Sequence, residues 1–349
     1  MAQDTIIARV EGRVGRLSLN RPEVLHALDI GMCRAMIQSL LAWREDPGVA
    51  AVMIDHAGAR GFCAGGDVRA AAQSGAGDGL AARDFFFTEY RLNALLHGYP
   101  KPVIAFMDGV VMGGGVGIAR PARYRIATER TVWAMPEGAI GLFPDVGAGW
   151  HLSRLAGAMG RWLALTGARL RAADCLLLGM ATDHVNSVDL ETLKGEIVAA
   201  PDSIEEALTR YEADAGEPPV AQVRDRIDRL FGKRGLDAVF AALEGDGSDW
   251  AQAQLKVLNA HSPSTLRVAF RQLRRAARMQ RFEDEMVMEY RIAVRLCQSH
   301  DFIEGVRAVL VDKDNAPRWN PPTLGEVSES RLAAIFAPLP PGDEWTPLP

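Results

Sequence analysis

The chain has 349 residues, of which 48% are hydrophobic and 24% are charged, a composition typical of one large globular domain or two smaller ones. Its net charge of -5 at pH 7 argues against nucleic acid as a partner, because phosphate backbones are bound by basic surfaces. No apolar run is long enough to span a bilayer, so no membrane partner is expected.

The cysteines and the N-terminus indicate the compartment. Four cysteines, at positions 33, 63, 175 and 297, lie far apart without a CxxC pair, so we expect thiols in a reducing environment. Cys63 is expected to be a small buried residue and not a nucleophile. The first residues lack the basic segment and the apolar core of a signal peptide. We therefore expect a cytoplasmic protein.

Strands and helices alternate in the pattern of the first half of the chain. Two β-rich runs at 5–10 and 14–19 are joined by Glu11-Gly12-Arg13, which predicts a hairpin. Apolar residues at helical spacing predict a helix over 29–44. Further strands are expected at four short runs, 50–55, 103–107, 125–128 and 131–134. The alternation predicts an α/β fold, with a sheet and helical crossovers.

The pattern becomes mostly helical from about residue 202, where Arg, Glu and Ala residues replace the β-rich runs. We expect three parts: a mixed core over 1–201, a helical region over 202–325 and a tail over 326–349. The proline-rich end of the tail, 338–349, is expected to be poorly ordered.

A strongly basic helix is predicted at 264–280. Its arginines stand at positions 267, 271, 274, 275 and 278. Such a stripe is usually a solvated helix face, and this is the favoured interpretation. Binding of an anionic ligand or of another subunit is the alternative.

Two glycine-rich segments each follow a predicted strand. The first is Gly61-Phe62-Cys63-Ala64-Gly65-Gly66-Asp67, and the second is Met112-Gly113-Gly114-Gly115-Val116-Gly117. Two such turns can direct N–H groups at one carbonyl oxygen as it gains charge. A tight strand-to-helix turn is the structural alternative, and it explains the first segment better when that segment is taken alone. Neither segment continues into the Gly-Lys-Ser/Thr of a Walker phosphate loop.

Two carboxylates stand in the apolar segment 135–147, downstream of the second glycine segment. Glu137 and Asp145 are candidates for an acid, a base or a nucleophile. Each has a structural alternative, because Pro-Glu is a common helix start and Pro-Asp a common turn. Their order after the glycine segments favours the functional interpretation.

These segments together resemble the crotonase (enoyl-CoA hydratase/isomerase) superfamily, and most closely its hydroxyacyl-CoA hydrolases. The resemblance covers about residues 5 to 320 and includes Asn20-Arg21-Pro22, 62–67, 89–93, 112–117, 135–147, 165–167, 254–257, Ser262-Pro263, 288–291, 300–313 and Trp319. It implies a crotonase-like spiral of ββα units, in which the helical C-terminal region closes the acyl-CoA site.

The resemblance also implies positions for substrate binding. The family's oxyanion hole falls on the N–H groups of Gly66 and Gly114. Ala64 and Gly65 would line the path of CoA, and Gly113 is a further substrate-binding position. The candidates for contacts with the CoA phosphates or adenine are three cations, Arg60, Arg69 and Lys313.

One departure from the family pattern favours hydrolysis over hydration. Glu137 falls on one of the two catalytic glutamates of the hydratases, whereas Gly117 replaces the other. Asp145 stands where hydratases usually have glycine, and the hydrolases of the family carry this Glu and Asp combination. Glu137 would attack the thioester or activate water, and Asp145 would position water or substrate and tune Glu137. Glu89 would bind the 3-hydroxyl group of the acyl chain, with an exposed helix acid as the alternative.

The resemblance therefore implies a hydrolase of a short, branched hydroxyacyl-CoA thioester. It implies no metal and no other cofactor, since CoA is part of the substrate. It also implies that the chain can form a homo-oligomer. An enoyl-CoA hydratase or isomerase is the first alternative, with a dehalogenase-like role for Asp145 as a weaker relative. A non-catalytic acyl-CoA or protein-binding module on the same scaffold is an alternative of another class.

Overall fold

The computed structural model describes residues 4–58 and 61–349, and contacts divide the chain into two compact units. Unit 1 consists of Met1–Gly66, Arg91–Ala134 and Arg169–Ala221. Unit 2 consists of Asp67–Tyr90, Met135–Ala168 and Gln222–Pro349. The units differ from the three consecutive parts expected from composition, because two segments of the first 201 residues pack with the C-terminal helices.

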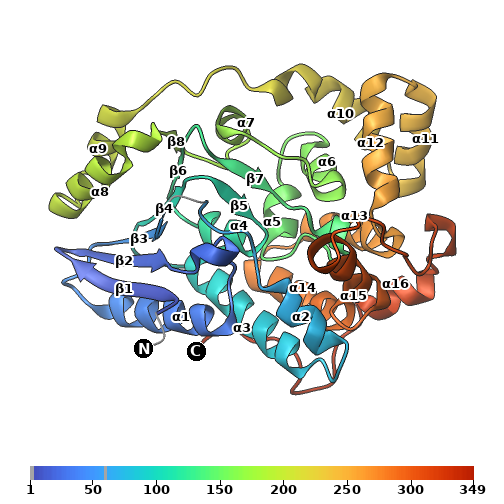
Figure 1. The fold of residues 1–349 in the computed structure, drawn as a ribbon, viewed down its shortest axis with the longest axis horizontal. Coiled ribbons are helices and arrows are strands. Elements are labelled where there is room, and N and C mark those ends of the chain that lie inside the picture. The colour runs from blue at the N-terminus through green and yellow to red at the C-terminus, as the bar shows by residue number, and fades with distance from the viewer. Residues whose placement is uncertain (1–3, 59–60) are drawn as a thin grey trace. The chain divides into compact units, whose positions relative to one another are not determined.

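Unit 1 is built on a six-stranded sheet with the order β1-β2-β3-β4-β6-β8 (Figure 1). Its strands are β1 Ile6–Glu11, β2 Val14–Leu19, β3 Ala51–His56, β4 Val103–Met107, β6 Tyr124–Ala127 and β8 Asp183–His184. The β1–β2 pair is antiparallel, as the expected hairpin requires, and every other pair is parallel. A second, two-stranded parallel sheet joins β5 Val110–Met112 to β7 Val132–Ala134. The predicted α/β fold is thus confirmed.

The helices of unit 1 cover this sheet with apolar faces. They are α1 Ile30–Glu45, α4 Gly114–Ala119, α7 Ala172–Leu177, α8 Leu190–Ala199 and α9 Ile204–Tyr211. Helix α1 begins where the Asp29 carboxylate accepts the N–H of Met32 at 2.8 Å. Apolar side chains of α8 and α9, among them Leu193, Ile197 and Leu208, pack with Phe106 of β4 in one buried cluster.

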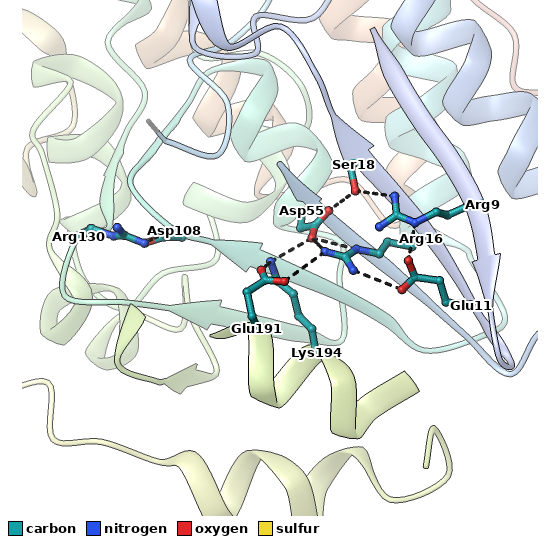
Figure 2. A network of polar contacts seen from close by, with 9 residues as sticks. All are labelled: Arg9, Glu11, Arg16, Ser18, Asp55, Asp108, Arg130, Glu191 and Lys194. Carbon is teal, nitrogen blue, oxygen red and sulfur yellow. Dashed lines mark hydrogen bonds and ion pairs between the residues drawn. The ribbon is translucent and has the colours of Figure 1, made fainter. Parts of the chain in front are cut away.

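A buried ion network joins β2, β3 and α8 within unit 1 (Figure 2). The Asp55 carboxylate is completely buried and accepts hydrogen bonds from Ser18 Oγ at 2.6 Å and Arg16 Nε at 3.1 Å. The ammonium group of Lys194 lies 3.0 Å from the same carboxylate. Burial by itself would raise the pKa of Asp55, but the charges of Lys194 and Arg16 and the hydrogen bonds outweigh it and lower the pKa.

Replacing Asp55 with Ala is expected to lower the free energy of unfolding by about 3 kcal/mol, because it removes the buried carboxylate that Arg16 and Lys194 share and leaves them only the more exposed Glu11 and Glu191. Denaturant unfolding monitored by circular dichroism measures the change. Asp202→Ala is the matched control, since its ion pair with Arg13 is exposed at both ends. The control should cost less than about 1 kcal/mol. Equal losses in the two variants would contradict a structural role for the network.

All regular secondary structure in the described part of unit 2 is helical. Its helices of at least five residues are α2 Val68–Gly75, the first part of α3 Leu80–His97, α5 Ala148–Leu152, α6 Met159–Thr166, α10 Arg224–Phe231, α11 Leu236–Asp246, α12 Asp249–Ala260, α13 Pro263–Ala276, α14 Phe282–Leu296, α15 His300–Val306, the π-helix Arg307–Val311 and α16 Glu329–Ile335. Short 3-10 turns occur at Pro22–Val24 and Ser187–Asp189 in unit 1 and at Glu137–Ile140 and Leu324–Glu326 in unit 2, and Pro219–Val223 runs from one unit into the other. None of the helices in the described part of the chain combines the length and apolarity needed to cross a membrane.

The proline-rich end of the chain differs from the expectation of poor order. Trp345 is only 2% exposed, and its indole N–H donates to the carbonyl oxygen of Phe87 at 3.2 Å. Ion pairs join Glu344 to Arg291 and Asp343 to Arg83. A buried indole and two ion pairs therefore fix this segment against the other helices of unit 2, which its proline content did not indicate.

Candidate active site

The two glycine segments lie side by side in unit 1. The N–H of Cys63 donates to the carbonyl oxygen of Val110 at 2.9 Å, and the N–H of Met112 donates to that of Cys63 at 3.0 Å. On its other side the first segment pairs with residues 25–28, since Leu28 N–H donates to Gly65 O at 2.8 Å and Ala64 N–H to Leu25 O at 2.9 Å. Cys63 itself is completely buried, as expected.

Glycine is required where these segments approach each other. Gly65 and Gly113 have positive φ angles of 121° and 49°, which side chains disfavour. A Cβ on Gly115 would lie 2.4 Å from the carbonyl oxygen of Cys63. A Cβ on Gly65 would lie 3.7 Å from the amide nitrogen of Gly114. All five glycine-segment residues expected to bind substrate (Ala64, Gly65, Gly66, Gly113 and Gly114) therefore belong to one pair of adjacent loops.

The position of Gly114 in its helix leaves its N–H without an acceptor inside that helix. Gly114 is the first residue of α4, and the first N–H groups of a helix have no acceptor within the helix. Gly66 forms a parallel bridge with Leu28 at the point where the first loop ends. The convergence of the Gly66 and Gly114 N–H groups on one carbonyl oxygen stays a prediction.

The three carboxylates proposed from the sequence form a buried cluster in unit 2. Glu89 lies on α3, Glu137 opens the 3-10 turn Glu137–Ile140, and Asp145 follows that turn before α5. Their exposed fractions are 2%, 5% and 4%, which excludes the exposed-acid alternative for Glu89. The hydroxyl of Tyr90 donates to Asp145 Oδ2 at 2.8 Å. Among the described residues, Glu89 Oε1 and Glu137 Oε2 are buried without a hydrogen-bond partner.

Burial makes all three groups weaker acids, and repulsion by neighbouring carboxylates adds to the effect at the two glutamates. Burial raises the pKa of Glu89 well above its usual range, and the charges of Asp145 and Glu137 raise it further. The pKa of Glu137 is likewise raised well above the usual range by burial and by Asp145. Burial raises the pKa of Asp145 to about 7, although the hydrogen bond from Tyr90 opposes the shift. A carboxyl group with a raised pKa is a stronger base once ionised, which suits it to proton transfer and nucleophilic attack.

Replacing Asp145 with Asn is expected to stabilise the protein at pH 8 and to stabilise it less at pH 5. A group whose pKa is raised on folding binds its proton more tightly in the folded state, so its presence costs stability as pH rises from about 4 through 7. The gain at pH 8 should be about 1–4 kcal/mol in the free energy of unfolding. Denaturant unfolding at both pH values measures it, with the exposed Asp284→Asn as control. A pH-independent difference would contradict the buried, weakly acidic state of Asp145.

Several buried polar residues around Asp145 received no role from the sequence, although Tyr90 and Glu289 lie in the segments 89–93 and 288–291 that carry the family resemblance. They are Tyr90 on α3, Gln272 on α13, and Glu285 and Glu289 on α14. The two glutamates are four residues apart on one helix and are completely buried. The available signal was their spacing among Met286, Met288 and Ile292, which places acids on the apolar face of α14.

The structure adds little on the three cations proposed for CoA contacts. Arg60 lies outside the described residues. The Arg69 guanidinium donates to the carbonyl oxygen of Leu310, and Lys313 is exposed, so CoA contacts by either remain a prediction. Ser262 caps α13 by accepting the N–H of Thr265.

The arginine stripe of α13 lines a cavity of about 350 Å³ in unit 2. Arg267 forms an ion pair with Asp237, and Arg271 forms one with Glu329, so acids of neighbouring segments compensate part of the charge. Both interpretations of the stripe, a solvated face and an anion site, are compatible with this arrangement.

Comparison with protein families identifies a match over residues 14–336 with the model of the family described as Enoyl-CoA hydratase/isomerase. The 3-hydroxyisobutyryl-CoA hydrolase of Gallus gallus, named as mitochondrial, is 41% identical over 343 residues, which cover 96% of this chain and 89% of that protein. The human protein of the same name is 38% identical, with 97% and 90% covered.

Solved structures of the same family confirm the predicted crotonase-like fold. A structure titled as a carnitinyl-CoA dehydratase from Mycobacterium thermoresistibile superposes with a TM-score of 0.94 at 40% identity, and the match covers 99% of each chain. A structure titled as an enoyl-CoA hydratase from Rhodobacter sphaeroides gives a TM-score of 0.91 at 37% identity, covering 98% of this chain and all of the other.

Proposed function

The chain belongs to the enoyl-CoA hydratase/isomerase family, and we propose that it is an acyl-CoA thioester hydrolase that converts 3-hydroxyisobutyryl-CoA and water into 3-hydroxyisobutyrate and CoA. The reaction is a step of valine degradation. The observation that carries the proposal is the buried pair of Glu137 and Asp145, with Gly117 in place of the second hydratase glutamate.

The proposed roles follow from the chemistry of thioester cleavage. The N–H groups of Gly66 and Gly114 bind the thioester oxygen and stabilise the negative charge that it gains in the transition state. Glu137 attacks the carbonyl carbon or removes a proton from the attacking water, and its raised pKa makes it a stronger base than an ordinary glutamate. Cleavage of the C–S bond then releases CoA, which takes up a proton.

Glu89 and Asp145 are assigned to binding and orientation. The partnerless Oε1 of Glu89 supports a hydrogen bond to the 3-hydroxyl group of the acyl chain. Asp145, oriented by Tyr90, holds the attacking water or the substrate and raises the pKa of Glu137 by like-charge repulsion. Ala64, Gly65 and Gly113 line the path of CoA in this proposal.

A hydratase or isomerase is disfavoured by Gly117. Hydration of a double bond uses a water held between two carboxylates, and position 117 lies inside α4 without a side chain. A purely binding module is disfavoured by the burial of three carboxyl groups, which costs free energy. Two of their oxygens, Glu89 Oε1 and Glu137 Oε2, have no hydrogen-bond partner among the described residues.

Thiol release from 3-hydroxyisobutyryl-CoA tests the function directly. The purified protein should produce free thiol from this ester and should leave the enoyl absorbance of crotonyl-CoA unchanged. Loss of that absorbance without thiol release would replace the proposal with a hydratase. Tight binding of both esters without any turnover would replace it with a binding module.

The cofactor, the partners and the compartment follow the same proposal. Thioester hydrolysis needs a nucleophile, a proton carrier and oxyanion donors, all of which the chain supplies, so we propose no cofactor beyond the CoA of the substrate. A homo-oligomer remains a prediction from the family. All four cysteines are buried thiols, which suits a reducing compartment, and the predicted cytoplasm is one such compartment.

A further inference from the structure

The segment that carries Asp145 is held by side chains from two distant helices of unit 2. Glu289 Oε2 on α14 accepts the N–H of Gly147 at 2.8 Å, and Oε1 accepts the N–H of Gly149 at 3.4 Å. The Gln272 amide on α13 donates to Glu289 Oε1 at 3.0 Å and to the carbonyl oxygen of Pro144 at 2.8 Å. The backbone is therefore fixed immediately before Asp145 and at two points after it.

The two glycines of this segment, Gly147 and Gly149, allow its backbone to approach the carboxyl group of Glu289. Gly147 has a φ of 86°, and a Cβ there would lie 2.7 Å from the ring of Phe282. A Cβ on Gly149 would lie 1.9 Å from Glu285 Oε1. Only a backbone without side chains at 147 and 149 can bring its N–H groups to the carboxyl of Glu289.

Burying the carboxyl groups of Glu285 and Glu289 costs free energy. Glu285 and Glu289 are completely buried beside each other, and Arg154 is the one cation among the described residues that opposes the shift at Glu285. Burial raises the pKa of both groups, that of Glu285 to about 7, and repulsion from Glu285 and Asp145 raises the pKa of Glu289 further. An apolar pair would pack here without this cost but would leave the N–H groups of Gly147 and Gly149 buried without an acceptor.

We propose that Glu289 is a positioning residue for thioester hydrolysis, which with Gln272 holds the 144–149 segment so that Asp145 is oriented for the reaction. The inference rests on the proposed function. Glu289 acts through Asp145 and does not touch the substrate. A displacement of about 1 Å at a reacting group typically lowers turnover about 100-fold, which sets the size of the expected effect.

A double-mutant cycle with Asp145→Asn tests the proposal. Glu289→Leu should lower kcat about 100-fold in the wild-type background and leave KM within about threefold. In the Asp145→Asn background, the same replacement should lower the remaining single-turnover rate less than about threefold, because the oriented group is already absent. Glu289→Gln keeps an acceptor oxygen and should restore kcat to within about tenfold of the wild type.

The controls separate the inference from general damage and from the function itself. Glu283→Leu, on the same helix but in a surface ion pair with Arg281, should leave kcat unchanged. An equal loss in both Asp145 backgrounds, or no rescue by Glu289→Gln, would overturn the inference. If Glu289→Leu does not fold, Gln272→Leu enters the same cycle with the same criterion. A wild-type protein without thiol release would instead overturn the proposed function.

Discussion

Glu137→Gln is expected to lower kcat for thiol release about 10³- to 10⁴-fold. The amide has nearly the same shape as the carboxyl but can neither ionise nor form an acyl anhydride. The side chain is 5% exposed, and Oε2 has no partner among the described residues, so the replacement breaks no hydrogen bond at that atom. Steady-state release of CoA, followed with a thiol reagent, measures the effect.

Loss of folding would not explain such a result. Burial raises the pKa of Glu137, so the ionised side chain costs stability at pH 8, and the neutral amide should raise the thermal midpoint there. Glu244→Gln, on the exposed face of α11, is the matched control and should keep full activity. A Glu137→Gln enzyme that retains more than about a tenth of wild-type kcat would remove Glu137 from the mechanism.

Solvent oxygen distinguishes the two roles that remain open for Glu137. If the carboxylate attacks the thioester, hydrolysis of the anhydride in ¹⁸O-labelled water can place the label in the side chain of Glu137. If the carboxylate activates water, the label enters only the hydroxy acid. After a single turnover, mass spectrometry of the peptide that contains residues 135–147 detects label in Glu137, which only the anhydride route can place there.

Local pattern indicated six of the eight strands in the described residues but not the short strands β5 and β8. The expected runs at 14–19 and 103–107 coincide with β2 and β4, since alternation and apolar runs are set by neighbouring residues. Glycine clusters and Pro-Glu or Pro-Asp pairs are equally local, so they indicated the two loops, Glu137 and Asp145, whereas the family resemblance alone indicated Glu89. The crotonase resemblance assigned their roles.

What the sequence did not reveal depends on contacts between distant residues. Gln272 and Glu289 reach the 144–149 segment across more than a hundred residues, and helical periodicity does not show that acids on α14 face inward. The same holds for Lys194, which meets Asp55 only because α8 packs on the sheet. The interleaving of the two units has the same origin, because composition shifts along the chain carry no information on which segments pack together.

Gly114→Pro should lower kcat/KM about 100- to 1,000-fold relative to Gly114→Ala, the size expected for one lost oxyanion donor. Both variants add a side chain at the same position, but only proline removes the N–H. Proline is compatible with the first residue of a helix, because that N–H has no acceptor within α4.

Free CoA provides the control for this comparison, because it has no thioester carbonyl and so cannot use the oxyanion donor. Its Kd should be the same in the Pro and Ala variants, as measured by calorimetry, while the rates differ. Equal rates in the two variants would show that the N–H of Gly114 does not stabilise the transition state. A parallel loss of CoA binding would instead show that proline has displaced the loop, since Gly65 lies directly against it.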